Sequence, residues 1–378
     1  MRSLSRRLHD ALLYIRGARK SLRRNARLVL GRSVARLMGS PDYRTSLSTT
    51  PVSSVLVCRI NGRMGNAVFL TPLIGRLHEL FPRASIDLAM SYPQAPSLLK
   101  GQPGVRHIIA FPHKGIDMVW RYFAAVRRIR AQTYDVVIDP TPESTSGRIV
   151  LTLSRAKYRV GFATQSQWAP LTHAIPEPEE FMHQAIRPVY LLCNIFGARY
   201  DQQAVRLSLH LQPAEIEAGR SAITRAIQRR NLRAGAGTVG FFAHGTGSKP
   251  LEQSWWVAFW KAFLELEPAA VPVEFLPSPT TAPTDARLAS LHVPSARDLT
   301  AAIATTRMFI SADTGPMHLA SATPVPTVAL FRASDPILYR PLKNNDLVID
   351  VRDCPPWLAA QHCHAVWRLS PRLSRVTV

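Results

Sequence analysis

From residue 54 onward the sequence alternates between short apolar runs and longer amphipathic segments, and this alternation limits the fold more than any other feature. Runs such as 85–90 and 134–140 predict strands, and the segments between such runs predict helices. Strands that are apolar almost throughout must be covered on both faces, which is typical of a parallel sheet between helical layers. The sequence therefore predicts an α/β fold.

The alternation occurs twice along the 378 residues, which suggests two domains. The charged helical segment 211–236 has little β character and is expected to bridge them. We expect an N-terminal Rossmann-like domain over 54–210 and a C-terminal one over 237–378, with ligands at the carboxyl ends of the strands. The predicted strands are 54–60, 85–90, 105–111, 134–140, 157–162, 238–244, 271–277, 307–311 and 325–331.

The first 40 residues carry eleven arginines and lysines and a single acid, Asp10, out of a net charge of +22 for the whole chain. Their apolar residues recur at helical spacing. Three interpretations stay open: a helix on an anionic membrane, a solvated arm packed on its own protein, and a transit peptide. Residues 41–53 are expected to form a linker.

The composition limits the class of protein to which the sequence can belong. The sequence has no apolar stretch long enough for a membrane span and no signal-peptide core, and its four cysteines are too sparse for a disulfide framework. A cytoplasmic, reducing location is therefore expected. The basic charge suggests an anionic partner, which could be a membrane surface, a nucleic acid or a phosphorylated substrate.

The segment 307–322, RMFISADTGPMHLASA, carries the sharpest local signal. A predicted strand ends near Ser311, and a helix follows within a few residues. Asp313 and Thr314 are good N-cap types, Gly315 permits close backbone approach, and Pro316 suits a first helical turn. The result is a group of free N–H groups at a positive helix end, which suits a phosphate, although a well-capped turn alone would look the same.

The string DTGPMHLA at 313–320 resembles the signature of the heptosyltransferase-like glycosyltransferases of family 9. The stretch RINGRMGNAVFLTPL at 59–73 is similar to that family's first strand–loop–helix, and HGTGSKPLEQSWW at 244–256 to the start of its second domain. Further similar segments, in the same order, extend the resemblance over about 54–350.

The resemblance implies a GT-B fold, in which two Rossmann-like domains face each other across a cleft. It implies a bacterial enzyme that transfers a heptose or related sugar from a nucleotide-sugar, with ADP-heptose as one possibility, to lipopolysaccharide or another glycan. The reaction would be a single inverting displacement without a metal or other cofactor. The enzyme would work on the inner face of the cytoplasmic membrane, where a basic arm could bind anionic lipid.

The resemblance also implies roles for particular residues. The departing diphosphate would be met by Thr314 and Gly315, with Lys249 matching the lysine that faces the donor phosphates. His318 could brace the loop or touch the phosphates, and both possibilities stay open. Asp313, Thr246 and Ser248 are further donor-side candidates, and the acceptor-side loop would consist of Gly62, Arg63 and Gly65.

Two positions depart from the family pattern. Where most heptosyltransferases carry an aspartate after the second glycine of the loop, this sequence has Asn66, an amide that can orient a hydroxyl but cannot take its proton. Asp139, at the end of a predicted strand, is the candidate base, and Glu143 and His244 have weaker claims. The segment 276–284, where an acid often approaches the ribose, contains none.

Two functions other than glycosyl transfer stay open. Asn66 leaves open a catalytically weakened relative that binds a nucleotide-sugar or a glycan without transferring it. The net charge leaves open a nucleic-acid-binding protein, but no helix-turn-helix, zinc or RNA-binding signature supports one, so no nucleic-acid partner is expected. Cys354 and Cys363 fit no standard zinc spacing, and no metal site is expected.

Overall fold

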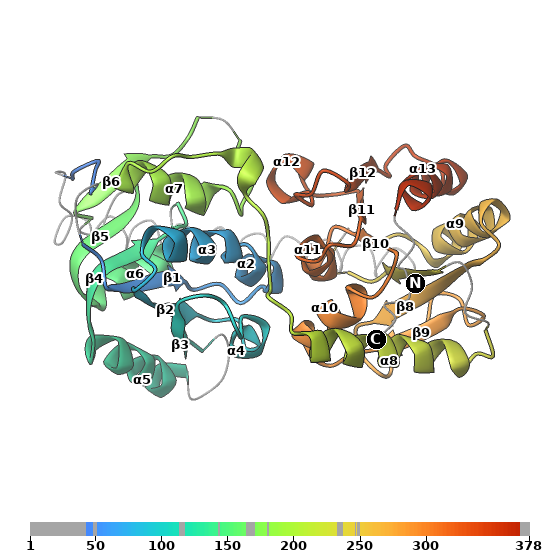
Figure 1. The fold of residues 1–378 in the computed structure, drawn as a ribbon, viewed down its shortest axis with the longest axis horizontal. Helices are drawn as coiled ribbons and strands as arrows, with labels where there is room; N and C mark the ends of the chain where they lie inside the picture. The colour runs from blue at the N-terminus through green and yellow to red at the C-terminus, as the bar shows by residue number, and fades with distance from the viewer. Residues whose placement is uncertain are drawn as a thin grey trace, which may run out of the picture.

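The computed structural model describes residues 43–47, 51–112, 118–142, 144–163, 171–179, 181–232, 237–245, 247 and 250–370. The basic arm 1–40 lies outside these residues. Two α/β halves stand side by side, the N-terminal half in blue to green and the C-terminal half in yellow to red (Figure 1). The predicted pair of Rossmann-like domains in a GT-B arrangement is confirmed.

Each half contains a six-stranded, fully parallel sheet, and the two sheets have the same topology. The N-terminal sheet has the order β3-β2-β1-β4-β5-β6, and the C-terminal sheet β12-β11-β10-β7-β8-β9. The strands are β1 Ser54–Arg59, β2 Ser85–Met90, β3 Val105–Ala110, β4 Thr133–Asp139, β5 Arg155–Ala163, β6 His173–Pro176, β7 Gly237–Phe242, β8 Ala270–Leu276, β9 Ala289–His292, β10 Met308–Ala312, β11 Thr327–Phe331 and β12 Leu347–Asp350.

Helices cover both faces of each sheet (Figure 1). Between β1 and β7 they are α2 Met64–Val68, α3 Thr71–Leu80, α4 Ala95–Leu98, α5 Met118–Arg130, α6 Thr145–Leu153, α7 Arg187–Phe196 and α8 Pro213–Gln228. After β7 they are α9 Gln253–Leu266, α10 Ala296–Ile303, α11 Gly315–Ser321, α12 Pro336–Tyr339 and α13 Pro356–Leu369.

Local chemistry explains where several helices begin and end. Ser144 and Ser295 cap α6 and α10 by accepting backbone N–H bonds, and Gly197 ends α7 in the left-handed region at φ 62°. The apolar segment that follows β1 forms two helices, α2 and α3, rather than one. Pro72 has no N–H to donate to the preceding turn, so the Thr71 hydroxyl donates to the Val68 carbonyl at 2.8 Å and α3 starts afresh.

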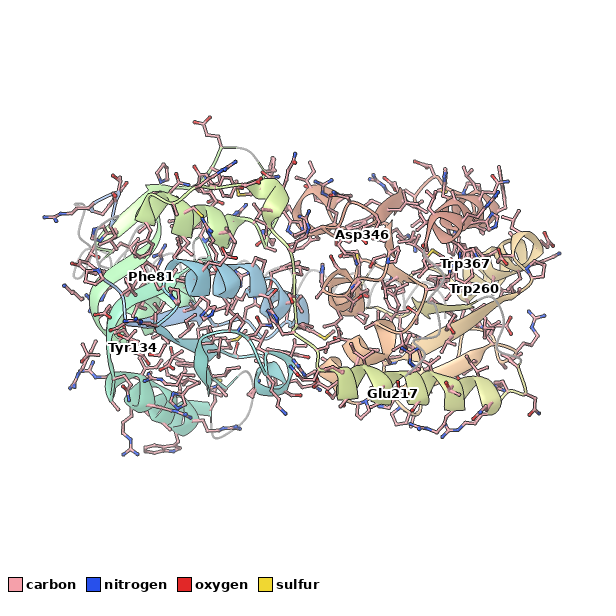
Figure 2. All side chains as sticks on the ribbon, viewed as in Figure 1. Phe81, Tyr134, Glu217, Trp260, Asp346 and Trp367 are labelled. Atoms are coloured by element: carbon pink, nitrogen blue, oxygen red, sulfur yellow. The ribbon has the colours of Figure 1, made fainter. Side chains whose placement is uncertain are left out.

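The core consists of strand side chains packed under helices on both faces of each sheet. In the C-terminal half, α9 and α13 pack against each other, with Trp260 and Trp367 between them (Figure 2). Trp256 and Trp260 are buried, so this face of α9 belongs to the core.

Among the described residues, the two halves contact each other through several elements. Helix α2 contacts α11, and α4 contacts α10. The loop before α7 bonds to α12, where Gln184 N–H donates to the Leu338 carbonyl at 3.1 Å. After α7 the chain passes along the boundary between the halves and enters α8, which packs on α10 under the C-terminal sheet (Figure 1).

Candidate functional site

The predicted phosphate motif and the predicted acceptor loop are brought together by the contact of α2 with α11. A Cβ added to Gly65 would lie 2.6 Å from Cδ2 of His318, and one added to Gly315 would collide with Met64. Each helix therefore presents a glycine to a side chain of the other. The close approach of the two halves depends on Gly65 having no side chain, because the ring of His318 is buried, whereas the end methyl of Met64 can turn away from Gly315.

The motif has the strand-to-helix geometry that its sequence predicts. Thr314 is the N-cap of α11 with an extended backbone, Gly315 is the first helical residue, and Pro316 follows in the first turn. The Thr314 side chain does not cap the helix. Its hydroxyl lies 3.2 Å from the Ala312 carbonyl and 3.2 Å from the Ser311 hydroxyl, so it is turned back toward the end of β10.

Asn66 is held by an arginine at the end of the first strand. Arg59 is 5% exposed, and its guanidinium donates to Oδ1 of Asn66 at 3.2 Å and to Oγ1 of Thr141 at 2.6 Å. Thr141 in turn donates its backbone N–H to Oδ1 of Asp139 at 3.1 Å. Burial lowers the pKa of Arg59 to about 10, so its guanidinium stays charged at neutral pH.

Both predicted catalytic candidates therefore belong to one hydrogen-bonded chain, Asp139–Thr141–Arg59–Asn66. Their places in it differ, because Asn66 is half-buried and Asp139 is fully buried. Burial raises the pKa of Asp139 to about 6, although Arg148, whose Nε lies 3.6 Å from Oδ2, opposes the shift. As arranged here, the carboxylate of Asp139 has no surface from which it could contact a substrate.

His318 lies in an aromatic layer between the halves. It is 6% exposed, and its ring packs edge-on against Phe69 with centroids 4.5 Å apart. Phe69 also contacts the ring of His183 at 5.2 Å. His183 is buried, its Nε2 lies 2.9 Å from the Arg340 carbonyl, and burial lowers its pKa to about 3. This packing matches the bracing role left open for His318.

The segment after β7 approaches the motif at Gly245. A Cβ on Gly245 would lie 3.1 Å from Cγ2 of Thr314. The predicted donor residues Thr246, Ser248 and Lys249 lie outside the described residues, as does Glu143. On the acceptor side, Arg63 is exposed, and its backbone N–H donates to Oδ1 of Asn61 at 3.1 Å.

The sequence reasoning missed Glu274. This residue lies inside β8 and is fully buried, and its carboxylate accepts from the backbone N–H and hydroxyl of Thr284 at 2.7 and 2.5 Å. Nε2 of His244 lies 3.0 Å from the same carboxylate. Glu274 lies just before 276–284, the segment in which an acid near the ribose was expected. A lone glutamate in the apolar run VPVEFLP was the signal that could have found it, because a buried carboxylate needs partners.

The described part of the chain offers no metal-binding cluster and no membrane-spanning helix. It contains no cluster of three or more histidine, cysteine or acidic side chains that could hold a metal ion. Among the same residues, no helix has the length and apolar character to cross a bilayer.

Comparisons with known proteins point to a single family. Residues 295–361, which include the DTGPMHLA motif, match the family model "Glycosyltransferase family 9 (heptosyltransferase)". Lipopolysaccharide heptosyltransferase 3 of Escherichia coli is 22% identical over 317 residues, which is 77% of this chain and 88% of the relative.

Solved structures of the same class share the fold. The glycosyl transferase family 9 protein of Veillonella parvula superposes with a TM-score of 0.71 at 16% identity, over 86% of this chain and all of the other. The E. coli ADP-heptose heptosyltransferase II gives 0.66 at 17% identity, over 84% and 99%. The E. coli heptosyltransferase WaaC, solved with ADP, gives 0.64 at 17% identity, over 83% and 99%.

Proposed function

The chain is a heptosyltransferase-like member of glycosyltransferase family 9, and from this membership we propose that it transfers a heptose or related sugar from a nucleotide-sugar to lipopolysaccharide. The observation that carries the proposal is the contact of α11 with α2, which joins the DTGPMHLA motif to the loop between Arg59 and Asn66. The proposed donor-phosphate site and acceptor-side loop would then meet where the sugar is transferred from donor to acceptor.

We propose that the C-terminal half binds the nucleotide-sugar. The backbone N–H groups at the start of α11 would meet the diphosphate, because the free N–H groups at the positive end of a helix attract anions. ADP-heptose is the proposed donor, since related enzymes were solved with ADP or with a fluorinated ADP-heptose. The side chains and loop positions proposed for this site are Thr246, Ser248, Lys249, Asp313, Thr314, Gly315 and His318.

The proposed reaction is a single displacement without a metal. The acceptor hydroxyl oxygen bonds to the anomeric carbon as the bond from that carbon to the diphosphate breaks, so the anomeric configuration inverts. The electron pair leaves with the diphosphate, whose growing charge would be met by Lys249 and the helix start. The acceptor hydroxyl loses its proton to a base.

Asn66 is proposed to orient the acceptor hydroxyl through its amide, with Arg59 fixing the amide by holding Oδ1. Gly62, Arg63 and Gly65 would form the rest of the acceptor-side loop. The role of Asp139 as general base stays a prediction, and it requires a conformation that exposes the carboxylate. In the arrangement described here, Asp139 acts on Asn66 only indirectly, through Thr141 and Arg59.

The test is a transfer assay with a panel of ADP-, UDP- and GDP-sugars, run beside a thermal-shift screen of the same donors. Turnover with one donor, lost in Thr314→Val and reduced in Asn66→Ala, is the expected result. Asn66→Asp is the informative partner variant, because a carboxylate there can titrate and should make the rate rise with pH. Equal rates in Asn66→Ala and wild type would remove Asn66 from the mechanism.

The amide at position 66 also favours a second function, a relative that binds nucleotide-sugar or glycan but no longer transfers it. Donor-induced stabilisation without turnover for any sugar of the panel would favour this second function. Restoration of turnover by Asn66→Asp would then identify the amide as the cause.

We also propose that the enzyme works at the inner face of the cytoplasmic membrane as a peripheral protein. A lipopolysaccharide acceptor is anchored in lipid, so the reacting hydroxyl lies near a membrane surface. The basic arm 1–40 is proposed to contribute to membrane binding through its arginines and its apolar stripe.

A further inference from the structure

Helix α5 exposes a cluster of large apolar side chains on its first two turns. Trp120 is 78% exposed and Phe123 64%, with ring centroids 6.5 Å apart, and Met118 and Val119 beside them are 44% and 57% exposed. No other helix in the described part of the chain exposes as many large apolar side chains. Such a cluster on the outer surface of a domain is typical of a site that contacts another protein or a membrane.

The second half of the same helix is basic. Arg127, Arg128 and Arg130 lie in its last turn, and Met118–Arg130 contains no acidic residue. At helical spacing Trp120, Phe123 and Arg127 fall on one face, while Ala125 and Ile129 are buried against the sheet. The exposed face therefore joins an aromatic end to a cationic end, which is the pattern of a helix lying in a membrane interface.

The position of α5 suits an approach to a membrane-bound acceptor. The helix lies on the outer side of the N-terminal half, away from the C-terminal half (Figure 1). It follows β3, which is parallel to β2 and β1. The aromatic end of α5 therefore lies toward the carboxyl ends of these strands, where β1 ends at Arg59. A membrane that binds the aromatic end of α5 would therefore also lie near the proposed acceptor loop.

We propose that α5 docks on an anionic phospholipid surface, with Trp120 and Phe123 at the level of the head groups and Arg127 and Arg128 against lipid phosphates. This assignment rests on the proposed function for its biological setting, because only a lipid-anchored acceptor requires it. A second copy of the chain is the weaker occupant. Two α5 faces brought together would oppose arginines with no acid to neutralise them.

The charge part is tested by sedimenting the full-length chain with phosphatidylcholine vesicles, with and without phosphatidylglycerol. Arg127→Ser with Arg128→Ser is expected to weaken binding to the anionic vesicles about 25-fold at low salt, at about fivefold per arginine. The matched control is Arg229→Ser with Arg230→Ser, which removes the same charge from exposed positions after α8. Equal binding of the two double variants would overturn the proposal.

Insertion is tested separately, by quenching tryptophan fluorescence with brominated lipid in the anionic vesicles. Trp120→Phe is expected to remove most of the quenching, while Trp357→Phe, at a position that is 55% exposed in the other half, should leave it unchanged. Equal quenching in wild type and Trp120→Phe would overturn the proposal. So would α5 variants that lose self-association in light scattering but bind vesicles normally.

These measurements need neither donor nor acceptor, so they separate docking from catalysis. Lost vesicle binding with normal transfer to a soluble acceptor would support the docking surface. Normal vesicle binding through α5 in a protein without turnover would refute the proposed function and leave the docking surface standing.

Discussion

Replacing Arg297 by methionine is expected to lower the free energy of unfolding by about 3–5 kcal/mol, because it removes a buried guanidinium that satisfies one carboxylate and four carbonyls. Arg297 is 4% exposed at the start of α10 and pairs with Glu215 of α8, with Nε–Oε1 at 2.6 Å and Nη2–Oε2 at 2.9 Å. Its guanidinium also donates to carbonyls at 2.8–3.1 Å from two other segments, namely those of Leu98, Lys100, Leu209 and His210.

The size of the effect follows from what each replacement leaves behind. Methionine fills similar space but leaves the carboxylate of Glu215 and four carbonyls without their donor. Lysine keeps the charge, but its three donors in a compact ammonium can replace only part of this set, so Arg297→Lys is expected to lose about 1–3 kcal/mol. An unfolding entropy on the order of 0.8 kcal/mol/K for 378 residues converts the methionine loss into a melting temperature about 4–6 °C lower.

Differential scanning calorimetry of wild type, Arg297→Lys, Arg297→Met and a control measures these shifts. The control is Arg287→Met, whose side chain is 79% exposed beside Asp285 in the same half, and its melting temperature should stay within about 1 °C of wild type. If Arg297→Met also melts within about 1 °C of wild type, the arginine does not stabilise the junction of the halves and the reasoning is refuted.

Three further predictions concern the site. Gly65→Ala should reduce transfer because its Cβ would lie 2.6 Å from the buried ring of His318, whereas Gly75→Ala, with nothing within 4 Å, should leave turnover at the wild-type level in the same assay. Because the folded-state pKa of Asp139 is raised to about 6, stability should fall by about 3 kcal/mol as pH rises from 4 through 6, and urea unfolding should find this fall missing in Asp139→Asn. Glu274→Leu should cost about 1–3 kcal/mol in urea unfolding by leaving a buried N–H without its acceptor, and a loss near zero would contradict this.

The central strands could be read from the sequence because both of their faces are buried. β1, β2, β10 and β11 are buried almost throughout, so each appears as a mostly apolar run. The edge strands β6, β9 and β12 have four residues each, and β9 and β12 are mostly half-exposed, so no run of sufficient length marked them. The break between α2 and α3 depended on Pro72, whose effect the apolar periodicity hid.

The candidate site was predictable where it lies in one stretch of sequence and unpredictable where partners come from distant segments. The strand-to-helix geometry at Thr314 follows from the order of residues in DTGP. The hydrogen bond between Arg59 and Asn66 spans seven positions, but Thr141, which also accepts from Arg59, lies after the end of β4, 82 positions away. The pairing of Glu274 with His244 joins residues 30 positions apart. Only the parallel order of β7 and β8 brings them together.

The contacts between the halves differ in chemistry, and this difference bears on how a donor enters. Near the motif, α2 and α11 touch at Gly65 and Gly315, and the rings of Phe69 and His318 pack beside them. At the other contact, Arg297 ties α10 to α4 and to the chain that crosses into α8 by six hydrogen bonds. A sugar placed between α2 and α11 requires these two helices to separate. Apolar contacts reform without a fixed geometry and the hydrogen bonds of a buried guanidinium do not, so we expect the halves to separate more readily at α2 and α11 than at Arg297.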